Sequence, residues 1–173
     1  MTWLLILFGV AVVVSPLMWF RQSPRQKLIT ELRRAASSMG LQVSLHRRPD
    51  ARDDETRLEC VCYRLPWLND SCRQNWVLQR YSNRGWESDD SSTINSVIKS
   101  AEWKWTIAEA HPQWNHFLEE IVADIPAGVS AIIANKTGIG FIWNERDDSS
   151  DLQKVAQNLK KLQQTAKKFA DEA

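Results

Sequence analysis

The first twenty residues hold the longest apolar run of the chain. Residues 3–20 read WLLILFGVAVVVSPLMWF and contain no formally charged side chain. As an α-helix this run would be about 27 Å long, close to the roughly 30 Å hydrocarbon thickness of a bilayer. Trp3 and Trp19 stand at its two ends, as in the aromatic belts of membrane helices. We therefore expect residues 1–22 to form a transmembrane anchor.

A cleaved signal peptide is the alternative interpretation of the same run. Such a peptide needs a basic segment before the apolar residues and a small-x-small cleavage site after them. Here only Met1 and Thr2 precede the run, and no A-x-A pattern follows it. These missing signals favour a retained anchor.

Helical and strand-like patterns follow over residues 23–173. Ser23 and Pro24 are typical of a helix start, and Gly40 is placed to end that helix. Strands are predicted over residues 41–47, 58–65, 76–81, 129–134 and 139–144, and further helices from 112 to about 125 and from 150 to about 170. The pattern of residues 93–105 is ambiguous and favours a helix. This order predicts an α+β fold, with a mainly antiparallel sheet of about five strands and helices packed on it.

Basic residues gather directly after the apolar run. Residues 21–48 hold seven basic residues and one acid, a net charge of +6, whereas the other 145 residues have a net charge of −5. Because basic residues beside a membrane span stay in the cytoplasm, we expect a periplasmic N-terminus and a cytoplasmic domain at the bacterial inner membrane. Trp3, Trp19, Arg21, Arg25 and Lys27 are the candidates for anchoring and for lipid headgroup contact. The acidic folded part argues against a nucleic-acid partner.

The cysteines do not form a recognisable metal site. Cys60, Cys62 and Cys72 make an odd count, which fits a reducing compartment better than a disulfide scaffold. Cys60 and Cys62 are two residues apart on a predicted strand, whereas structural zinc sites use a turn between paired cysteines. We expect neither a metal nor a cofactor.

The histidines supply the remaining candidates for catalysis. His111 and His116 are five residues apart, so they would not share one face of a helix. The sequence lacks the nucleophile elbow, the phosphate-binding loop, the zinc-protease motif and the dinucleotide fingerprint. We expect a non-catalytic protein. The alternative is a membrane-surface enzyme of unknown reaction that pairs His46, His111 or His116 with a carboxylate.

The tryptophans of the folded part are one candidate for an interaction surface. Trp103 and Trp105 flank Lys104 in a polar context, and Trp114 follows soon after. Tryptophan is enriched at binding hot spots. The alternative is that these side chains cover an edge of the sheet, since tryptophan is usually largely buried.

The last predicted helix is the other candidate. Its apolar positions are spaced three and four residues apart: Leu152, Val155, Leu159, Leu162, Ala166 and Phe169. A seam of this kind could build a homo-oligomer as a coiled coil, with Leu152, Leu159 and Leu162 as interaction candidates. Its flanking positions carry few charges that could specify a partner, so docking on the domain's own sheet is favoured.

A family resemblance rests on residues 15–26 and on the layout of the chain. The apolar run ends in SPLMWF, the next helix starts with SPRQ, and an acidic α+β domain follows. This layout resembles a family of uncharacterised bacterial single-span inner-membrane proteins, sometimes labelled as similar to the YajC ancillary subunit of the preprotein translocase. We expect a membrane-anchored, non-catalytic interaction module or accessory subunit of an inner-membrane complex. Its expected partners are the lipid bilayer and a protein of unknown identity.

Overall fold

The computed structural model describes residues 2, 3, 6, 23–49, 51, 58–80, 102–145 and 149–171. The chain divides into two compact units, Met1–Leu32 and Arg33–Ala173. Three helices are described, α2 (Pro24–Ser38), α3 (Asn115–Asp124) and α4 (Ser149–Asp171). Two short 3₁₀ turns, η1 (Asp70–Cys72) and η2 (Pro112–Trp114), lie between the longer elements.

A single sheet of six strands forms the centre of the second unit. The strands are β1 (Gln42–Arg47), β2 (Leu58–Pro66), β3 (Trp76–Arg80), β4 (Trp103–Trp105), β5 (Val129–Asn135) and β6 (Gly138–Trp143). Their order across the sheet is β1-β2-β6-β5-β3-β4, and each neighbouring pair is antiparallel. The fold is therefore α+β, with two central strands, β5 and β6, that come from one hairpin.

Local sequence signals explain the ends of these elements. Ser23 and Gln26 form a capping box, in which the Gln26 amide donates to Ser23 Oγ at 3.2 Å and the Ser23 amide donates to Gln26 Oε1 at 3.0 Å. Gly40 has a φ of 83°, the left-handed conformation that glycine adopts at low cost when it ends a helix. Asn135 Oδ1 accepts from the Thr137 and Gly138 amides in the turn between β5 and β6.

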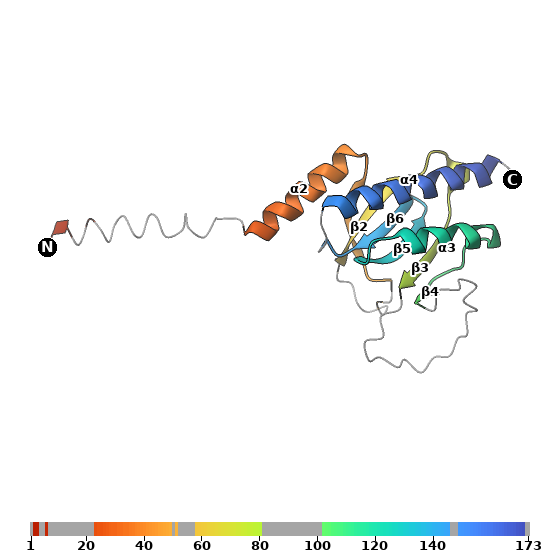
Figure 1. Ribbon diagram of the computed structural model, residues 1–173, viewed down its shortest axis with the longest axis horizontal. Helices are drawn as coiled ribbons and strands as arrows, with labels where there is room; N and C mark the ends of the chain where they lie inside the picture. The colour runs from red at the N-terminus through yellow and green to blue at the C-terminus, as the bar shows by residue number, and fades with distance from the viewer. Residues whose placement is uncertain are drawn as a thin grey trace, which may run out of the picture. The chain divides into compact units, whose positions relative to one another are not determined.

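One face of the sheet carries the large side chains and the helices. Because directly paired residues share a face, Tyr63, Phe141, Ile132, Leu78 and Trp105 form one buried row across five strands. Figure 1 shows α3 and α4 on the sheet, with α4 lying across β2 and β6. The core is the layer between this row and the two helices.

Two parts of the sequence-predicted fold are wrong. Within the described residues, no helix is both long enough and apolar enough to cross a membrane, so the fold as described contains no transmembrane helix. Most of the predicted anchor, residues 1–22, lies outside the described residues.

The second correction concerns the number of strands. The sheet has six strands rather than about five, because Trp103–Trp105 forms β4 in a segment for which a helix was favoured. Trp103 and Trp105 are buried while Lys104 between them is exposed, and this alternation is the period-two pattern of a strand. Three residues are too few for that pattern to stand out in the sequence. The rest of the predicted helix up to residue 101 lies outside the described residues.

Candidate functional site

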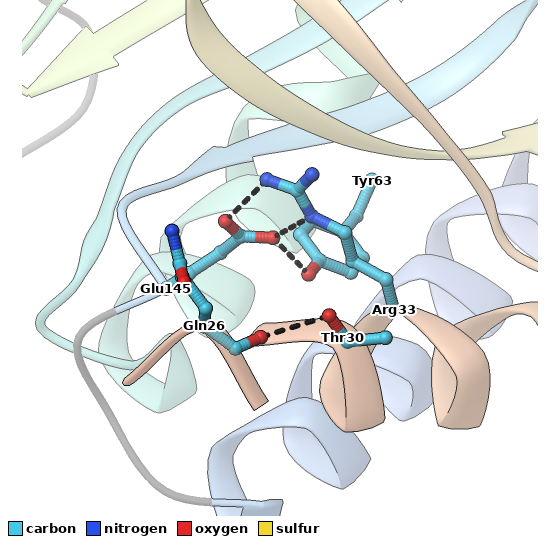
Figure 2. Close-up of polar contacts among 5 residues, drawn as sticks. All are labelled: Gln26, Thr30, Arg33, Tyr63 and Glu145. Atoms are coloured by element: carbon cyan, nitrogen blue, oxygen red, sulfur yellow. Dashed lines mark hydrogen bonds and ion pairs between the residues drawn. The ribbon is translucent and has the colours of Figure 1, made fainter. Parts of the chain in front are cut away.

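A buried carboxylate with three donors lies just after β6. Glu145 is 6% exposed and has a φ of 51°, a conformation that residues other than glycine seldom adopt. Arg33 donates to it through Nε at 2.8 Å and Nη2 at 2.7 Å, and Tyr63 donates its hydroxyl hydrogen at 2.7 Å (Figure 2). We call Arg33, Tyr63 and Glu145 the Glu145 cluster.

Each member of the Glu145 cluster comes from a different element. Arg33 lies on α2, Tyr63 lies in the middle of β2 and Glu145 lies two residues after the end of β6. Tyr63 also packs its ring edge to face against Trp143 at a centroid distance of 5.2 Å. The cluster therefore ties the second half of α2, from Arg33 onward, to the middle of β2 and to the segment that follows β6.

The electrostatics of the Glu145 cluster keep Arg33 charged and Tyr63 protonated. The hydrogen bond to Glu145 raises the pKa of Arg33, so its guanidinium stays charged. Burial raises the pKa of Tyr63 well above its ordinary value of 10.0, and the hydrogen bond to Glu145 adds to the rise. A charged arginine and a protonated tyrosine both donate to the carboxylate, which is the arrangement of a structural ion pair.

Sequence reasoning did not identify the Glu145 cluster. Arg33 counted only as one of the basic residues after the apolar run, and neither Tyr63 nor Glu145 was singled out. The available signal is weak: one acidic residue, Glu145, comes directly after an apolar strand that ends in FIWN. The positive φ and the 112-residue separation of the pair Arg33–Glu145 are properties of the fold.

The three histidines stand apart from the Glu145 cluster. His46 is half-buried on β1, and its Nδ1 lies 2.8 Å from the carbonyl oxygen of Arg47. His111 precedes η2 and His116 lies on α3, both exposed. In the part of the chain that the structure describes, no hydrogen bond or ion pair joins a histidine to a carboxylate. The alternative of a histidine–carboxylate enzyme stays a prediction.

The three cysteines lie on or beside the sheet and are not disulfide-bonded. Cys62 is fully buried on β2, and burial raises the pKa of its thiol, although Arg64 Nη2 at 3.9 Å partly opposes this rise. Cys60 is half-buried on the same face of β2, and Cys72 is buried in η1. Among the described residues, no group of three or more histidines, cysteines and carboxylates could hold a metal ion.

The predicted tryptophan candidates are buried in the core. Trp105 contacts Trp76 edge to face at 5.7 Å, Trp76 contacts Trp114 at 5.6 Å, and Trp114 contacts Phe169 of α4 at 5.2 Å. Trp103 is also buried, with the Arg80 guanidinium 5.0 Å from its ring centroid. These rings connect the sheet to η2 and α4, and their role in binding a partner stays a prediction.

The predicted leucine seam is also buried. Leu152, Leu159 and Leu162 on α4 are at most 1% exposed, so the domain's own core covers them.

Only some of the residues predicted to contact the membrane belong to the described part of the chain. Trp3, Arg25 and Lys27 are exposed, whereas Trp19 and Arg21 lie outside the described residues.

The outer edge of the sheet at β1 is the most open apolar surface that the described strands provide. All six residues of β1 are exposed or half-buried, and no described strand pairs with its outer side. Leu45 is 56% exposed, and it shares its face of the sheet with the half-buried Val43 and Val61. We call Val43, Leu45 and Val61 the β1 patch.

The opposite edge of the sheet, at β4, also has no described strand on its outer side, but its apolar side chains are buried. Both tryptophans of β4 are buried, and the chain after β4 continues to bond to β3. The Thr106 amide donates to the Val77 carbonyl at 3.0 Å, and the Val77 amide donates to the Ala108 carbonyl at 3.4 Å.

No family model, no curated protein and no solved structure matches the chain. The function is therefore argued from the geometry of the residues alone.

Proposed function

We propose that this protein is a non-catalytic interaction module or accessory subunit that works at the cytoplasmic side of the bacterial inner membrane. The observation that carries the proposal is the open β1 edge with its apolar β1 patch. An edge strand presents unpaired backbone N–H and C=O groups, which a second chain can pair with. An extended peptide that adds a strand gains these hydrogen bonds and fills side-chain positions beside them.

The composition of the β1 patch supports a protein partner. Leu45, Val43 and Val61 are apolar side chains at the rim of a face whose inner part is fully buried. Edge strands are usually shielded by charge, by proline or by a covering segment. In β1, charge is found only at the end of the strand, at Arg47, next to a register shift between His46 and Arg47. Among the described residues, no strand pairs with the rest of β1 on its outer side, which leaves it open for pairing.

The membrane location is drawn from the sequence. The uncharged apolar run of residues 3–20 and the net charge of +6 over residues 21–48 are adjacent. Basic segments of this kind are attracted to the anionic inner leaflet. The state of the Glu145 cluster supports a non-catalytic role, because its charged arginine and its protonated tyrosine are both bonded to the carboxylate.

The test compares the β1 patch with another exposed apolar side chain. Full-length protein carrying Leu45→Lys is purified from gently solubilised membranes beside wild type and Ile107→Lys. Ile107 is the matched control because it is 66% exposed and lies after β4, at the other edge of the sheet. Wild type and Ile107→Lys should retain the same stoichiometric partner, identified by mass spectrometry, and Leu45→Lys should lose it at least tenfold.

Two results would contradict the proposed function. One is equal recovery of the partner with all three proteins, which would remove the β1 patch from the interface. The other is wild-type protein that purifies alone and stays in the soluble fraction after cell lysis.

A further inference from the structure

The outward face of α4 carries a set of exposed lysines. Lys154, Lys161 and Lys168 are seven residues apart and form one row along the helix, and Lys160 and Lys167 form a second row. Three exposed glutamines lie between the rows: Gln153, Gln157 and Gln164. The longer row spans about 21 Å at 1.5 Å per residue. We call these five lysines the α4 lysine face.

The α4 lysine face has a surplus of positive charge: among the described residues, α4 holds five lysines and two acidic residues. Within the residues that the structure describes, none of the five lysines forms an ion pair, and the acidic residues of α4, Asp151 and Asp171, lie near its two ends. The opposite side of the helix is buried in the core through Leu152, Leu159 and Leu162. The core thus holds α4 in place, and its five lysines are exposed to solvent.

The side chains of this face do not suit a protein interface. Protein interfaces usually centre on aromatic, aliphatic or arginine side chains, and lysine is depleted in them. The outward face of α4 presents lysine and glutamine side chains without any of those anchors. It also lacks the aromatic side chains on which single-stranded nucleic acids stack. A broad set of point charges suits a surface that is recognised by its charge density.

We infer that the α4 lysine face docks on anionic phospholipid headgroups at the membrane surface. This inference rests on the membrane location in the proposed function. Each lysine near an anionic leaflet contributes about fivefold to the binding constant, so five lysines give a strong attraction that salt weakens. The domain would then lie with α4 against the lipid, in one orientation.

Amine footprinting of the full-length protein tests this orientation. The protein is mixed with vesicles of phosphatidylcholine alone, or with vesicles in which phosphatidylglycerol replaces part of it, and lysines are acetylated and quantified by mass spectrometry. The five lysines of α4 should react at least fivefold more slowly on the phosphatidylglycerol vesicles, and high salt should restore their reactivity. Lys104 and Lys136, also exposed, should not change.

Lys104 is a suitable control because of where it lies. It pairs with Gln79 across β3 and β4, and it points away from the face that Trp103 and Trp105 share with α4. A lysine on that side should stay reactive when α4 rests on a vesicle.

A matched pair of variants removes the same charge from two places. In the double variant Lys154→Gln/Lys161→Gln, the protection of Lys160, Lys167 and Lys168 from acetylation should be about tenfold weaker. It should also be lost at a lower salt concentration. The double variant Lys104→Gln/Lys136→Gln should change neither the protection nor the salt concentration at which it is lost. All four positions are exposed, so folding should be preserved, and circular dichroism checks this.

Three results would overturn the inference. The lysines of α4 could react equally on both kinds of vesicle, both pairs of substitutions could act alike, or protection could require an acidic polypeptide or RNA instead of phosphatidylglycerol. The proposed function is judged separately, by the partner that copurifies through the β1 patch. Loss of lipid protection with the partner retained would therefore refute only the docking of α4.

Discussion

The two faces of the sheet differ in side-chain size and in how far burial extends. On the face that carries α3 and α4, the row Tyr63, Phe141, Ile132, Leu78 and Trp105 is buried as far as the edge strand β4. On the opposite face, the row one residue away is Ser44, Cys62, Ile142, Ala131, Gln79 and Lys104. Only its three central members are buried, and both of its ends are exposed.

This difference shows how the two faces are stabilised. The helix-covered face buries aromatic rings against η2 and α4, and large apolar side chains contribute most of the hydrophobic stabilisation. The opposite face packs small and branched side chains closely, with a cluster of Val77, Ala131, Ile133 and Ile142 at its centre. Removing volume should therefore damage the first face most, and adding volume should damage the second.

The largest effect is expected from Trp114→Ala on the helix-covered face. Trp114 is fully buried and contacts Trp76, Phe117 and Phe169, so its removal leaves a large cavity. The free energy of unfolding should fall by about 3–5 kcal/mol in denaturant titrations. The control, Ile107→Ala, removes a side chain that is 66% exposed and should change stability by less than about 0.5 kcal/mol. A similar loss of unfolding free energy in both variants would show that the aromatic contacts of Trp114 do not stabilise the helix-covered face.

The sequence predicted the central elements well because their patterns are local. The apolar runs at residues 129–134 and 139–144 correspond to β5 and β6, and the helical spacing from residue 150 corresponds to α4 (Ser149–Asp171). The leucines of α4 were placed on one stripe by spacing alone, and that stripe is buried. Each of these features depends on residues within a few positions of one another.

Features that depend on distant residues were not predicted. Strand β4 is three residues long, so pairing with β3 defines it more than its own sequence does. Arg33 and Glu145 are 112 residues apart, and nothing local marks either residue as a partner of the other. The apolar patch on β1 depends on β1 being the edge of the sheet, and strand order is not encoded in the alternation of polar and apolar residues.

Adding volume to the opposite face is expected to cost somewhat less than the cavity. A Cβ on Gly140 would lie 2.8 Å from the Tyr63 carbonyl oxygen and 2.9 Å from Cys62 Sγ, both closer than real contacts allow. Gly140→Ala should therefore lower the free energy of unfolding by about 1–3 kcal/mol, measured by denaturant titration.

A double-mutant cycle identifies which contact is responsible. Cys62→Ala removes the sulfur but leaves the Tyr63 carbonyl in place, so it should rescue Gly140→Ala only in part. Complete rescue would mean that the backbone contact costs nothing, and strict additivity would mean that Cys62 plays no part in the strain.

A smaller effect is expected at the ion pair beside the helix-covered face. Glu145→Gln keeps the size of the side chain but replaces charged hydrogen bonds by neutral ones, so it should cost roughly 1–2 kcal/mol. The matched control is Asp70→Asn, since Arg73 and Asp70 also pair at 2.7 Å but are both exposed. Exposed pairs of this kind contribute about 0–1 kcal/mol. Equal losses in denaturant titrations would show that burial of Glu145 adds nothing.

The smallest effect is a pH dependence that belongs to Tyr63. Its pKa is raised above 10.0 in the folded protein by burial and by Glu145, so the folded state keeps this proton at a pH where the unfolded state loses it. Stability from this proton is complete below about pH 10 and declines as pH rises further, by up to about 1.4 kcal/mol per pH unit. Tyr63→Phe lacks this proton. The difference in unfolding free energy between wild type and Tyr63→Phe should therefore shrink by about 1 kcal/mol between about pH 9 and pH 11. A constant difference over this range would show that the Tyr63 hydroxyl is not held by the buried carboxylate.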